Sequence, residues 1–130
     1  MVSNFRRGRA GHAGRRCLLY AALVVSRVVS IPGEGLVCVD LGHKAIASEG
    51  ALEKRVSFLN APGLEAIGHS EEHLVLEITD GAAYKVGDLL YGVPFHVCPT
   101  IALHDQATVV SGGRVVEHWH TARHRSIQQQ

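Results

Sequence analysis

A histidine and a cysteine two residues apart, in a stretch bounded by prolines, are the side chains best suited to chemistry. The stretch reads Pro94-Phe-His96-Val-Cys98-Pro-Thr100. In an extended segment, alternate residues share one face about 6.5–7 Å apart, so an imidazole nitrogen and a thiolate could converge on one zinc ion. Because proline lacks an N–H and disfavours helix in the residue before it, we expect an extended shelf here. A closed structural zinc site needs four ligands, so two would suit an open site completed by water, substrate or another part of the protein. The alternative is a buried cysteine beside a surface histidine.

The composition indicates a folded domain preceded by a basic N-terminal segment. The chain has 130 residues, of which 46% are hydrophobic and 19% charged, so it suits one globular domain rather than a disordered segment. Residues 1–16 contain five arginines and no acid, although the whole chain has a formal charge of only +1. The remainder is therefore slightly acidic, which argues against a nucleic-acid-binding face on the folded part.

The cysteines and the first apolar run indicate in which cellular compartment the protein is expected. Cys17, Cys38 and Cys98 are odd in number and show no CxxC pair, so no disulfide framework is visible and we expect a reducing, cytoplasmic location. Residues 17–31 form an apolar run after the arginines, which could be a secretory or organellar targeting segment. Because Arg27 interrupts the run and it is too short to span a membrane, a long β-strand is the favoured interpretation.

The elements that position the His-x-Cys stretch are short strands. The run over 17–31 and the strand over 36–40 read as a hairpin around Pro32 to Gly35, and alternation predicts strands over 55–59, 71–79 and 89–93. The pair Gly112-Gly113 predicts a tight turn between strands at 109–110 and 114–119. Helical turns could form over 48–53 and from Thr100 to His104. We therefore expect a mainly β, small antiparallel β-barrel or sandwich-like domain over residues 17–125. A disordered basic leader (1–16) precedes it, and a frayed tail (126–130) follows it.

Five short blocks, taken in order, resemble a known enzyme family. They are Asp40-Leu-Gly-His-Lys44-Ala, Ser70-Glu-Glu-His73, Lys85-Val-Gly-Asp88, Pro94-Phe-His96-Val-Cys98-Pro-Thr100 and a closing Val-Val-Glu-His-Trp119. Their order and spacing resemble the C-terminal domain of the D-serine dehydratase / D-threonine aldolase-like family, over Leu19 to Arg125. Members of that family are fold-type III pyridoxal-phosphate enzymes, in which an N-terminal α/β barrel carries the cofactor on a lysine and a C-terminal β-domain closes over it. The resemblance implies that His96 and Cys98 bind a divalent metal, Zn²⁺ in the dehydratase-like branch, beside the substrate.

The family's α/β barrel has no counterpart in this chain. Such a barrel needs about 200 residues or more, and none of Lys44, Lys54 and Lys85 has the context of the cofactor lysine. The resemblance implies the metal-binding domain of a lyase acting on D-hydroxy-amino acids, inactive without a pyridoxal-phosphate barrel partner and able to self-associate through the surface where that partner docks. Two alternatives stay open: a non-catalytic remnant or binding module that keeps the fold, and a small secreted β-domain with a signal sequence.

Four further residues are candidates for a supporting role. His73 either faces the site or lies on the outer side of a strand, and Asp40 more simply caps a turn. Lys44, within its family block, would support the fold or the domain interface. His104 could support the metal ligands from behind or be an ordinary exposed histidine. His118, His120 and His124 are interpreted as surface residues.

Overall fold

The structure is a computed structural model that describes residues 2–4 and 20–122. Strands dominate it, and they are separated by one 3-10 turn and one short helix. In chain order the elements are β1 (Val2–Asn4), β2 (Val24–Gly33), β3 (Leu36–Val39), η1 (Leu52–Lys54), β4 (Val56–Phe58), β5 (Leu64–His69), β6 (Leu74–Ile78), β7 (Leu89–Pro94), α1 (Val97–Ile101), β8 (Gln106–Ser111) and β9 (Arg114–His120).

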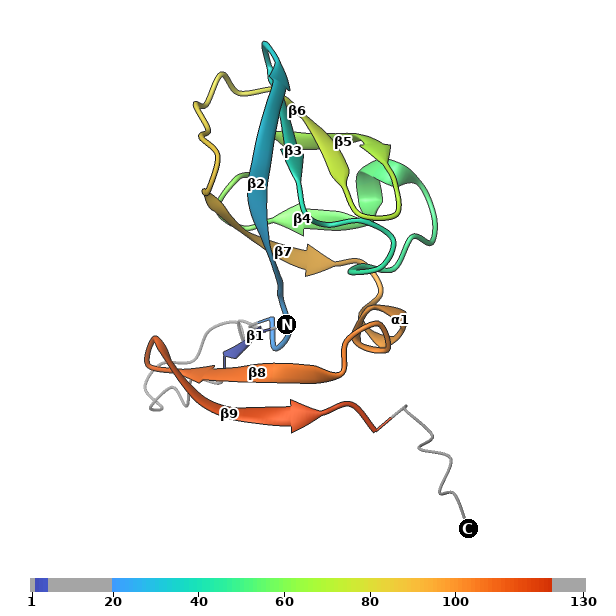
Figure 1. Ribbon diagram of the computed structural model, residues 1–130, viewed down its shortest axis with the longest axis vertical. Helices are drawn as coiled ribbons and strands as arrows, with labels where there is room; N and C mark the ends of the chain where they lie inside the picture. The colour runs from blue at the N-terminus through green and yellow to red at the C-terminus, as the bar shows by residue number, and fades with distance from the viewer. Residues whose placement is uncertain (1, 5–19, 123–130) are drawn as a thin grey trace, which may run out of the picture.

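Six strands form a nearly closed antiparallel barrel, as the sequence predicted (Figure 1). Their order is β4-β7-β2-β3-β6-β5, and every neighbouring pair is antiparallel. Alternation decides which side chains enter the interior: in β6, Leu74 and Leu76 are buried and face Val39 and Val37 of β3, while Glu77 is exposed. The core consists of Val24, Val28, Val37, Val39, Leu41, Ile46, Val56, Phe58, Ala61, Leu64, Leu74, Leu76 and Leu90.

The first predicted hairpin is confirmed, with different limits. β2 begins at Val24 and continues through Pro32 to Gly33, so the turn is only Glu34-Gly35, where Gly35 has a φ of 71° that favours glycine. Residues 17–19 of the predicted strand lie outside the described residues. Register shifts interrupt the pairing of β2 with β3.

Strand β5 was missed by sequence reasoning. Its register shifts between Ala66 and Gly68, and Ile67 is exposed, so the alternation that marks a half-buried strand is broken in its middle. The strand nevertheless completes one edge of the barrel against β6.

The closing hairpin is confirmed, but it belongs to a second sheet. β8 and β9 join through Gly112 and Gly113, with φ of 59° and 77°, and β1 pairs in parallel with β8. Val2–Asn4 lie in the predicted leader and pair with the open edge of β8. The disorder of residues 1–16 stays a prediction. Residues 5–16 and the predicted tail (126–130) lie outside the described residues.

The prediction of an extended shelf from Pro94 to Thr100 is wrong. β7 ends at Pro94, and after two residues α1 begins at Val97, so Cys98 and Pro99 are helical. Proline is tolerated in the first helical turn because the N–H that it lacks would have no helical partner there. The restriction on the residue before proline is a preference and not a prohibition, and Cys98 is helical despite it.

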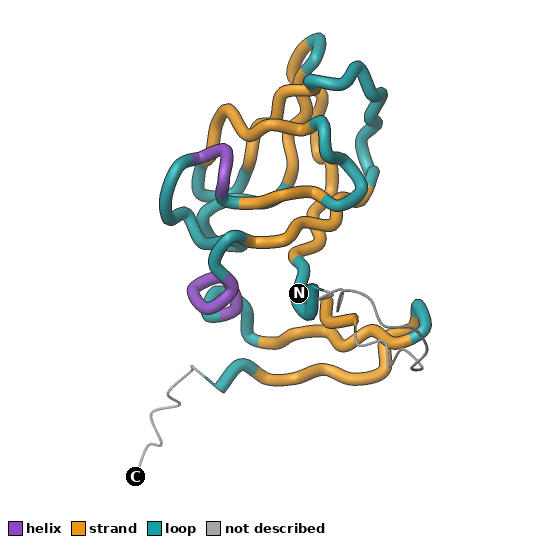
Figure 2. Tube along the Cα trace, turned by 180° about the vertical axis from the view of Figure 1, so that it is seen from behind, coloured by secondary structure: helices purple, strands orange, loops and turns teal. Residues whose placement is uncertain are grey.

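Helix α1 lies between the barrel and the β8–β9 hairpin in both views of the chain (Figures 1 and 2). It therefore stands at the junction of the two sheets, where the chain leaves β7. Among the described residues, no helix is long and apolar enough to cross a membrane. Cys38 is half-buried in β3, Cys98 is exposed, and the two form no disulfide.

Candidate metal centre

His96 and Cys98 lie at the point where β7 gives way to α1. His96 has extended backbone angles (φ −123°, ψ 104°) and precedes the helix, whereas Cys98 is the second helical residue. Alternate residues share a face within a continuous strand, but the backbone changes from extended to helical between His96 and Cys98. Convergence of the two side chains on one ion therefore stays a prediction. Within residues 2–4 and 20–122, no group of three or more His, Cys, Asp or Glu side chains is arranged to hold a metal.

His96 has a carboxylate partner that sequence reasoning missed. The Nδ1 atom of His96 lies 2.6 Å from Oε2 of Glu49, although 47 positions separate the two residues. An ionised carboxylate can only accept hydrogen bonds, so Nδ1 carries the hydrogen and the lone pair of the neutral ring lies on Nε2. Both side chains remain about half exposed, at 48% for His96 and 59% for Glu49.

Thr100 ties the start of α1 to the loop that carries Glu49. Its side chain is fully buried, and its hydroxyl donates a hydrogen bond of 2.8 Å to the His96 carbonyl. The same hydroxyl oxygen accepts a hydrogen bond of 3.1 Å from the Ala47 N–H. One buried side chain thus fixes the backbone at His96 to the backbone two residues before Glu49.

Arg55 makes a matching connection on the other side of the pair. Its carbonyl accepts a 2.9 Å hydrogen bond from the Phe95 N–H, and its guanidinium donates to the Gly50 carbonyl at 3.3 Å. The residues next to His96 and Glu49 are therefore held to the same arginine.

The four candidates for a supporting role occupy different places. Asp40 follows β3 directly, beside the Val28–Val39 pair, and its side chain accepts a 2.6 Å hydrogen bond from the Arg27 N–H. Lys44 is exposed and pairs with Glu72 and Glu71, which raise its pKa. His73 is exposed in the turn before β6. His104 donates a hydrogen bond from Nε2 to the Ala45 carbonyl at 2.9 Å. Its side chain therefore binds the backbone of the loop that leads to Glu49.

A second histidine, His69, was also missed and is a structural brace. Its Nδ1 accepts a hydrogen bond from the Arg55 guanidinium at 2.9 Å, since arginine can only donate, and its Nε2–H donates to the Leu41 carbonyl at 3.0 Å. Burial, together with neighbouring His43, lowers the pKa of His69. A neutral ring is therefore built into this side of the barrel. No pattern in the sequence distinguishes it from the other histidines.

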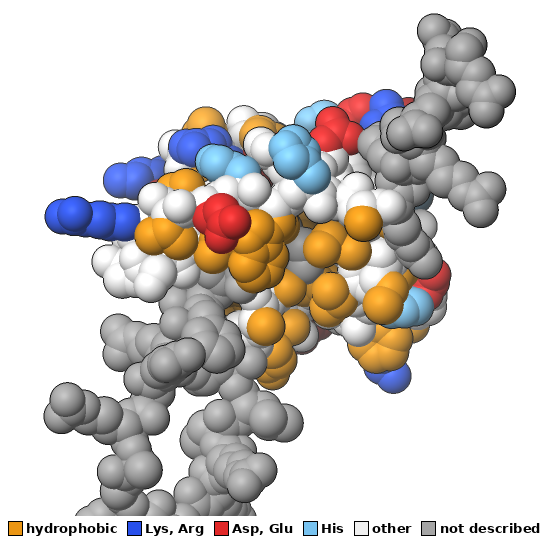
Figure 3. All heavy atoms as spheres, turned by 90° about the horizontal axis from the view of Figure 1, so that it is seen from below, with side chains coloured by type: hydrophobic (Ala, Val, Ile, Leu, Met, Phe, Trp, Pro, Cys, Tyr) orange, Lys and Arg blue, Asp and Glu red, His pale blue; other side chains and the backbone are white. Residues whose placement is uncertain are grey.

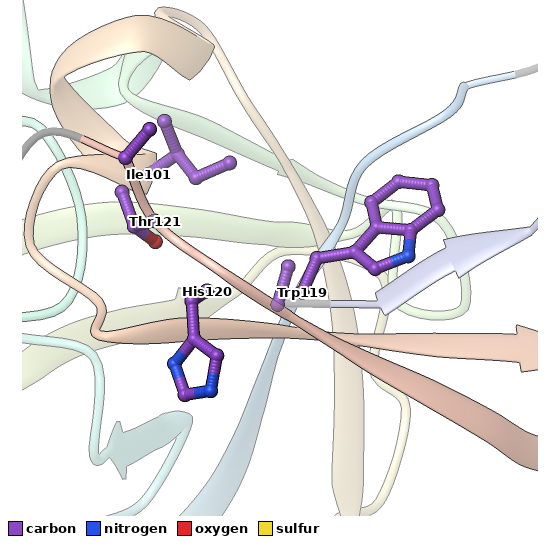
Figure 4. A pocket seen from close by; sticks show the side chains of 6 residues that line it. Ile101, Trp119, His120 and Thr121 are labelled. Atoms are coloured by element: carbon purple, nitrogen blue, oxygen red, sulfur yellow. The ribbon is translucent and has the colours of Figure 1, made fainter.

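A cavity of about 370 Å³ lies apart from these residues, between α1 and the β8–β9 hairpin (Figure 4). Its lining is mainly apolar: Ile101, Ala107, Trp119, His120, Thr121 and Ala122. In the close view, Ile101 and Thr121 lie near each other and the Trp119 ring lies to one side. None of the predicted metal ligands or supporting residues lines it.

Hydrophobic side chains gather on the face seen from below, at the end where α1 and the hairpin lie (Figure 3). The exposed large hydrophobic residues of these segments are Phe95, Val97, Leu103, Val115, Val116 and Trp119. Phe95 is 71% exposed, although it directly precedes His96. An apolar surface of this kind is typical of a contact with another protein or domain.

Comparison with known proteins matches residues 21–110 to the family described as the putative serine dehydratase domain. A D-threonine aldolase from Arthrobacter sp. is 35% identical over 97 residues, covering 74% of this chain and 25% of the aldolase. The crystal structure of a D-threonine aldolase from Filomicrobium marinum superposes with a TM-score of 0.71 and 30% identity, over 81% of this chain and 28% of that one.

A third protein is similar to this chain in fold. The D-threo-3-hydroxyaspartate dehydratase from Delftia sp. HT23 gives a TM-score of 0.62 at 24% identity, over 77% of this chain and 31% of the dehydratase. Structures of a D-threo-3-hydroxyaspartate dehydratase as a histidine-to-alanine variant and as a metal-free cysteine-to-alanine variant also superpose, each with a TM-score of 0.63 at 24% identity. The chain thus spans between a quarter and a third of the length of these relatives.

Proposed function

The chain belongs to the putative serine dehydratase domain family, and we propose that it is the metal-binding β-domain of a lyase that acts on D-hydroxy-amino acids. Its relatives are larger enzymes in which this domain is C-terminal. The cofactor-bearing α/β barrel would be a further part of the protein or a separate partner chain. The observation that carries the metal assignment is the His96–Glu49 pair, because it engages Nδ1 and leaves Nε2 of His96 as the ligand atom, two residues before the exposed Cys98.

The donor set fits zinc. His96 offers the Nε2 lone pair, and Cys98 offers a thiolate from the first turn of α1. Imidazole and thiolate are ligands that zinc prefers over the all-oxygen sets of magnesium and calcium. Two protein ligands leave open positions, as a catalytic zinc site requires. A zinc ion held there would act as a Lewis acid on the β-hydroxyl of the substrate.

We assign no pyridoxal-phosphate site to this chain. Lys44 is paired with Glu71 and Glu72, and Lys54 and Lys85 are exposed, so no lysine of the described residues sits in an enclosed site for the cofactor. In the complete enzyme this cofactor would supply the electron sink for carbanion chemistry. The hydrophobic side chains exposed on the face seen from below support docking of such a partner at that end of the domain.

Zinc content tests the metal assignment. The purified chain is dialysed against zinc, and bound metal is compared with that of a His96→Ala, Cys98→Ala double variant. Both side chains are exposed, so the double variant should fold, which circular dichroism verifies. We expect one zinc per chain that the double variant loses. Equal zinc in both proteins would remove the site.

Reconstitution tests the lyase assignment. The chain is mixed with a separately produced barrel domain of a family member, pyridoxal phosphate, zinc and a D-β-hydroxy-amino acid. Release of ammonia or glycine that depends on both His96 and Cys98 is the expected result. Zinc binding without any product would instead favour a non-catalytic binding module that keeps the fold.

A further inference from the structure

We propose that Glu49 is a positioning residue that fixes the ring of His96 for metal binding. This inference rests on the proposed function, because it concerns the geometry of one of the two proposed ligands. Its basis is the 2.6 Å contact between Glu49 Oε2 and His96 Nδ1. A metal-binding histidine commonly donates its second ring N–H to a carboxylate, which sets the tautomer, orients the ring and makes the ligating nitrogen more basic.

Nδ1 of His96 and Oε2 of Glu49 are too close together to be two ligand atoms of one ion. Zinc binds histidine nitrogen and carboxylate oxygen at about 2.0–2.2 Å, so two tetrahedral ligand atoms lie about 3.3 Å apart. The observed separation of 2.6 Å is that of a charge-assisted hydrogen bond. In addition, no cluster of three ligating side chains occurs in the part of the chain that the structure describes. Glu49 contacts Nδ1, whereas Nε2 is the proposed ligand atom, so Glu49 acts through His96.

The pair is also held more firmly than two exposed side chains ordinarily are. On one side, the Thr100 hydroxyl bridges the His96 carbonyl and the Ala47 N–H at 2.8 and 3.1 Å. On the other side, Arg55 bridges the Phe95 N–H and the Gly50 carbonyl.

These bridges brace the backbone next to both partners. Every backbone atom that they bond lies within two residues of Glu49 or His96. The loop that carries Glu49 and the turn that carries His96 are therefore fixed to each other. An isolated surface ion pair must order two unrestrained side chains and contributes little for that reason. Here the backbone bridges already restrict the positions of Glu49 and His96, so less entropy is lost when their side chains pair. This favours an orienting role for the carboxylate.

The test compares Glu49→Ala and Glu49→Gln with Glu53→Gln, an exposed acid four positions along the chain. Zinc affinity is measured by competition with a chromophoric chelator. We expect Glu49→Ala to weaken zinc binding by about 10- to 100-fold. Glu49→Gln, which keeps an acceptor oxygen but no charge, should fall between wild type and Glu49→Ala, and Glu53→Gln should match wild type.

A second measurement separates orientation from general damage to the fold. In the metal-free chain, ¹⁵N NMR identifies which ring nitrogen of His96 carries the hydrogen in the neutral form of the ring. We expect the Nδ1–H form in wild type and Glu53→Gln, and a shift toward the Nε2–H form in Glu49→Ala. A structural role alone would leave this tautomer unchanged.

The two hypotheses fail in different ways. If wild type and the His96→Ala, Cys98→Ala variant bind zinc equally, the metal site itself is wrong. If wild type binds zinc through those residues but Glu49→Ala keeps the same affinity and tautomer, the site stands and the role of Glu49 is refuted.

Discussion

Replacing Thr100 by valine should destabilise the domain and loosen the segment that carries His96 and Cys98, the proposed metal ligands. Valine has nearly the shape of threonine but cannot bond the His96 carbonyl or the Ala47 N–H, which the hydroxyl contacts at 2.8 and 3.1 Å. Ala47 is only 9% exposed, so its N–H would lose its partner away from water. His96 is an exposed residue, and water can reach its carbonyl more easily.

The magnitude follows from that difference. A buried donor left without a partner costs about 1–3 kcal/mol, so we expect about 2 kcal/mol for Thr100→Val. In a domain of this size that corresponds to a fall in Tm of about 10 °C. Thr100→Ser keeps the hydroxyl and loses one methyl group, which should cost about 1 kcal/mol. Urea and thermal unfolding measure these changes.

The matched control is Thr79→Val. The Thr79 hydroxyl donates to the Gly63 carbonyl at 2.9 Å, but the Thr79 N–H also bonds that carbonyl, so no polar group is left without a partner. We expect a smaller loss there, below about 1 kcal/mol. The reasoning is refuted if Thr100→Val is no more destabilising than Thr79→Val, or if Thr100→Ser is the more damaging change at position 100.

Three further predictions concern the body of the domain. Burial lowers the pKa of His69 in the folded state. The neutral ring therefore contributes its full stability above about pH 6.5, the pKa in the unfolded chain, and that contribution is lost as pH falls toward the folded pKa. Urea unfolding from pH 7.5 to 4.5 should show this loss of stability, and His69→Gln should make the loss smaller. Gly42→Ala should destabilise the domain by about 1–3 kcal/mol, because the new Cβ would clash with the Glu71 carbonyl oxygen. Gly68→Ala should be tolerated, since its Cβ would meet Val75 at an ordinary 3.6 Å. Equal losses of stability in the two variants would be inconsistent with this packing. The exposed apolar face should make the isolated chain self-associate, and light scattering that finds only monomer at high concentration would argue otherwise.

The sequence was most informative where local pattern determines structure. Leu74 and Leu76 alternate with outward-facing neighbours, and Gly112-Gly113 sits where the chain must adopt positive φ, so β6 and the closing hairpin were predictable. β5 was not, because the shift at Gly68 breaks the alternation.

The site was harder to predict because its contacts are distant in sequence. Glu49 lies 47 positions from His96, and Ala47 lies 53 positions from Thr100, so no periodicity relates them. The two proposed ligands could be named from their types and spacing, and from the family resemblance. The backbone that presents them could not, because the local preference of Cys98 before a proline was outweighed by the helical turn that buries Thr100.

X-ray absorption spectroscopy of the zinc-loaded chain tests the central claim most directly. If His96 and Cys98 are the ligands, the spectrum will contain one sulfur at about 2.3 Å and nitrogen or oxygen neighbours at about 2.0–2.1 Å, and the sulfur will disappear in a Cys98→Ser variant. A zinc shell without sulfur, or a sulfur neighbour that persists in Cys98→Ser, would contradict it.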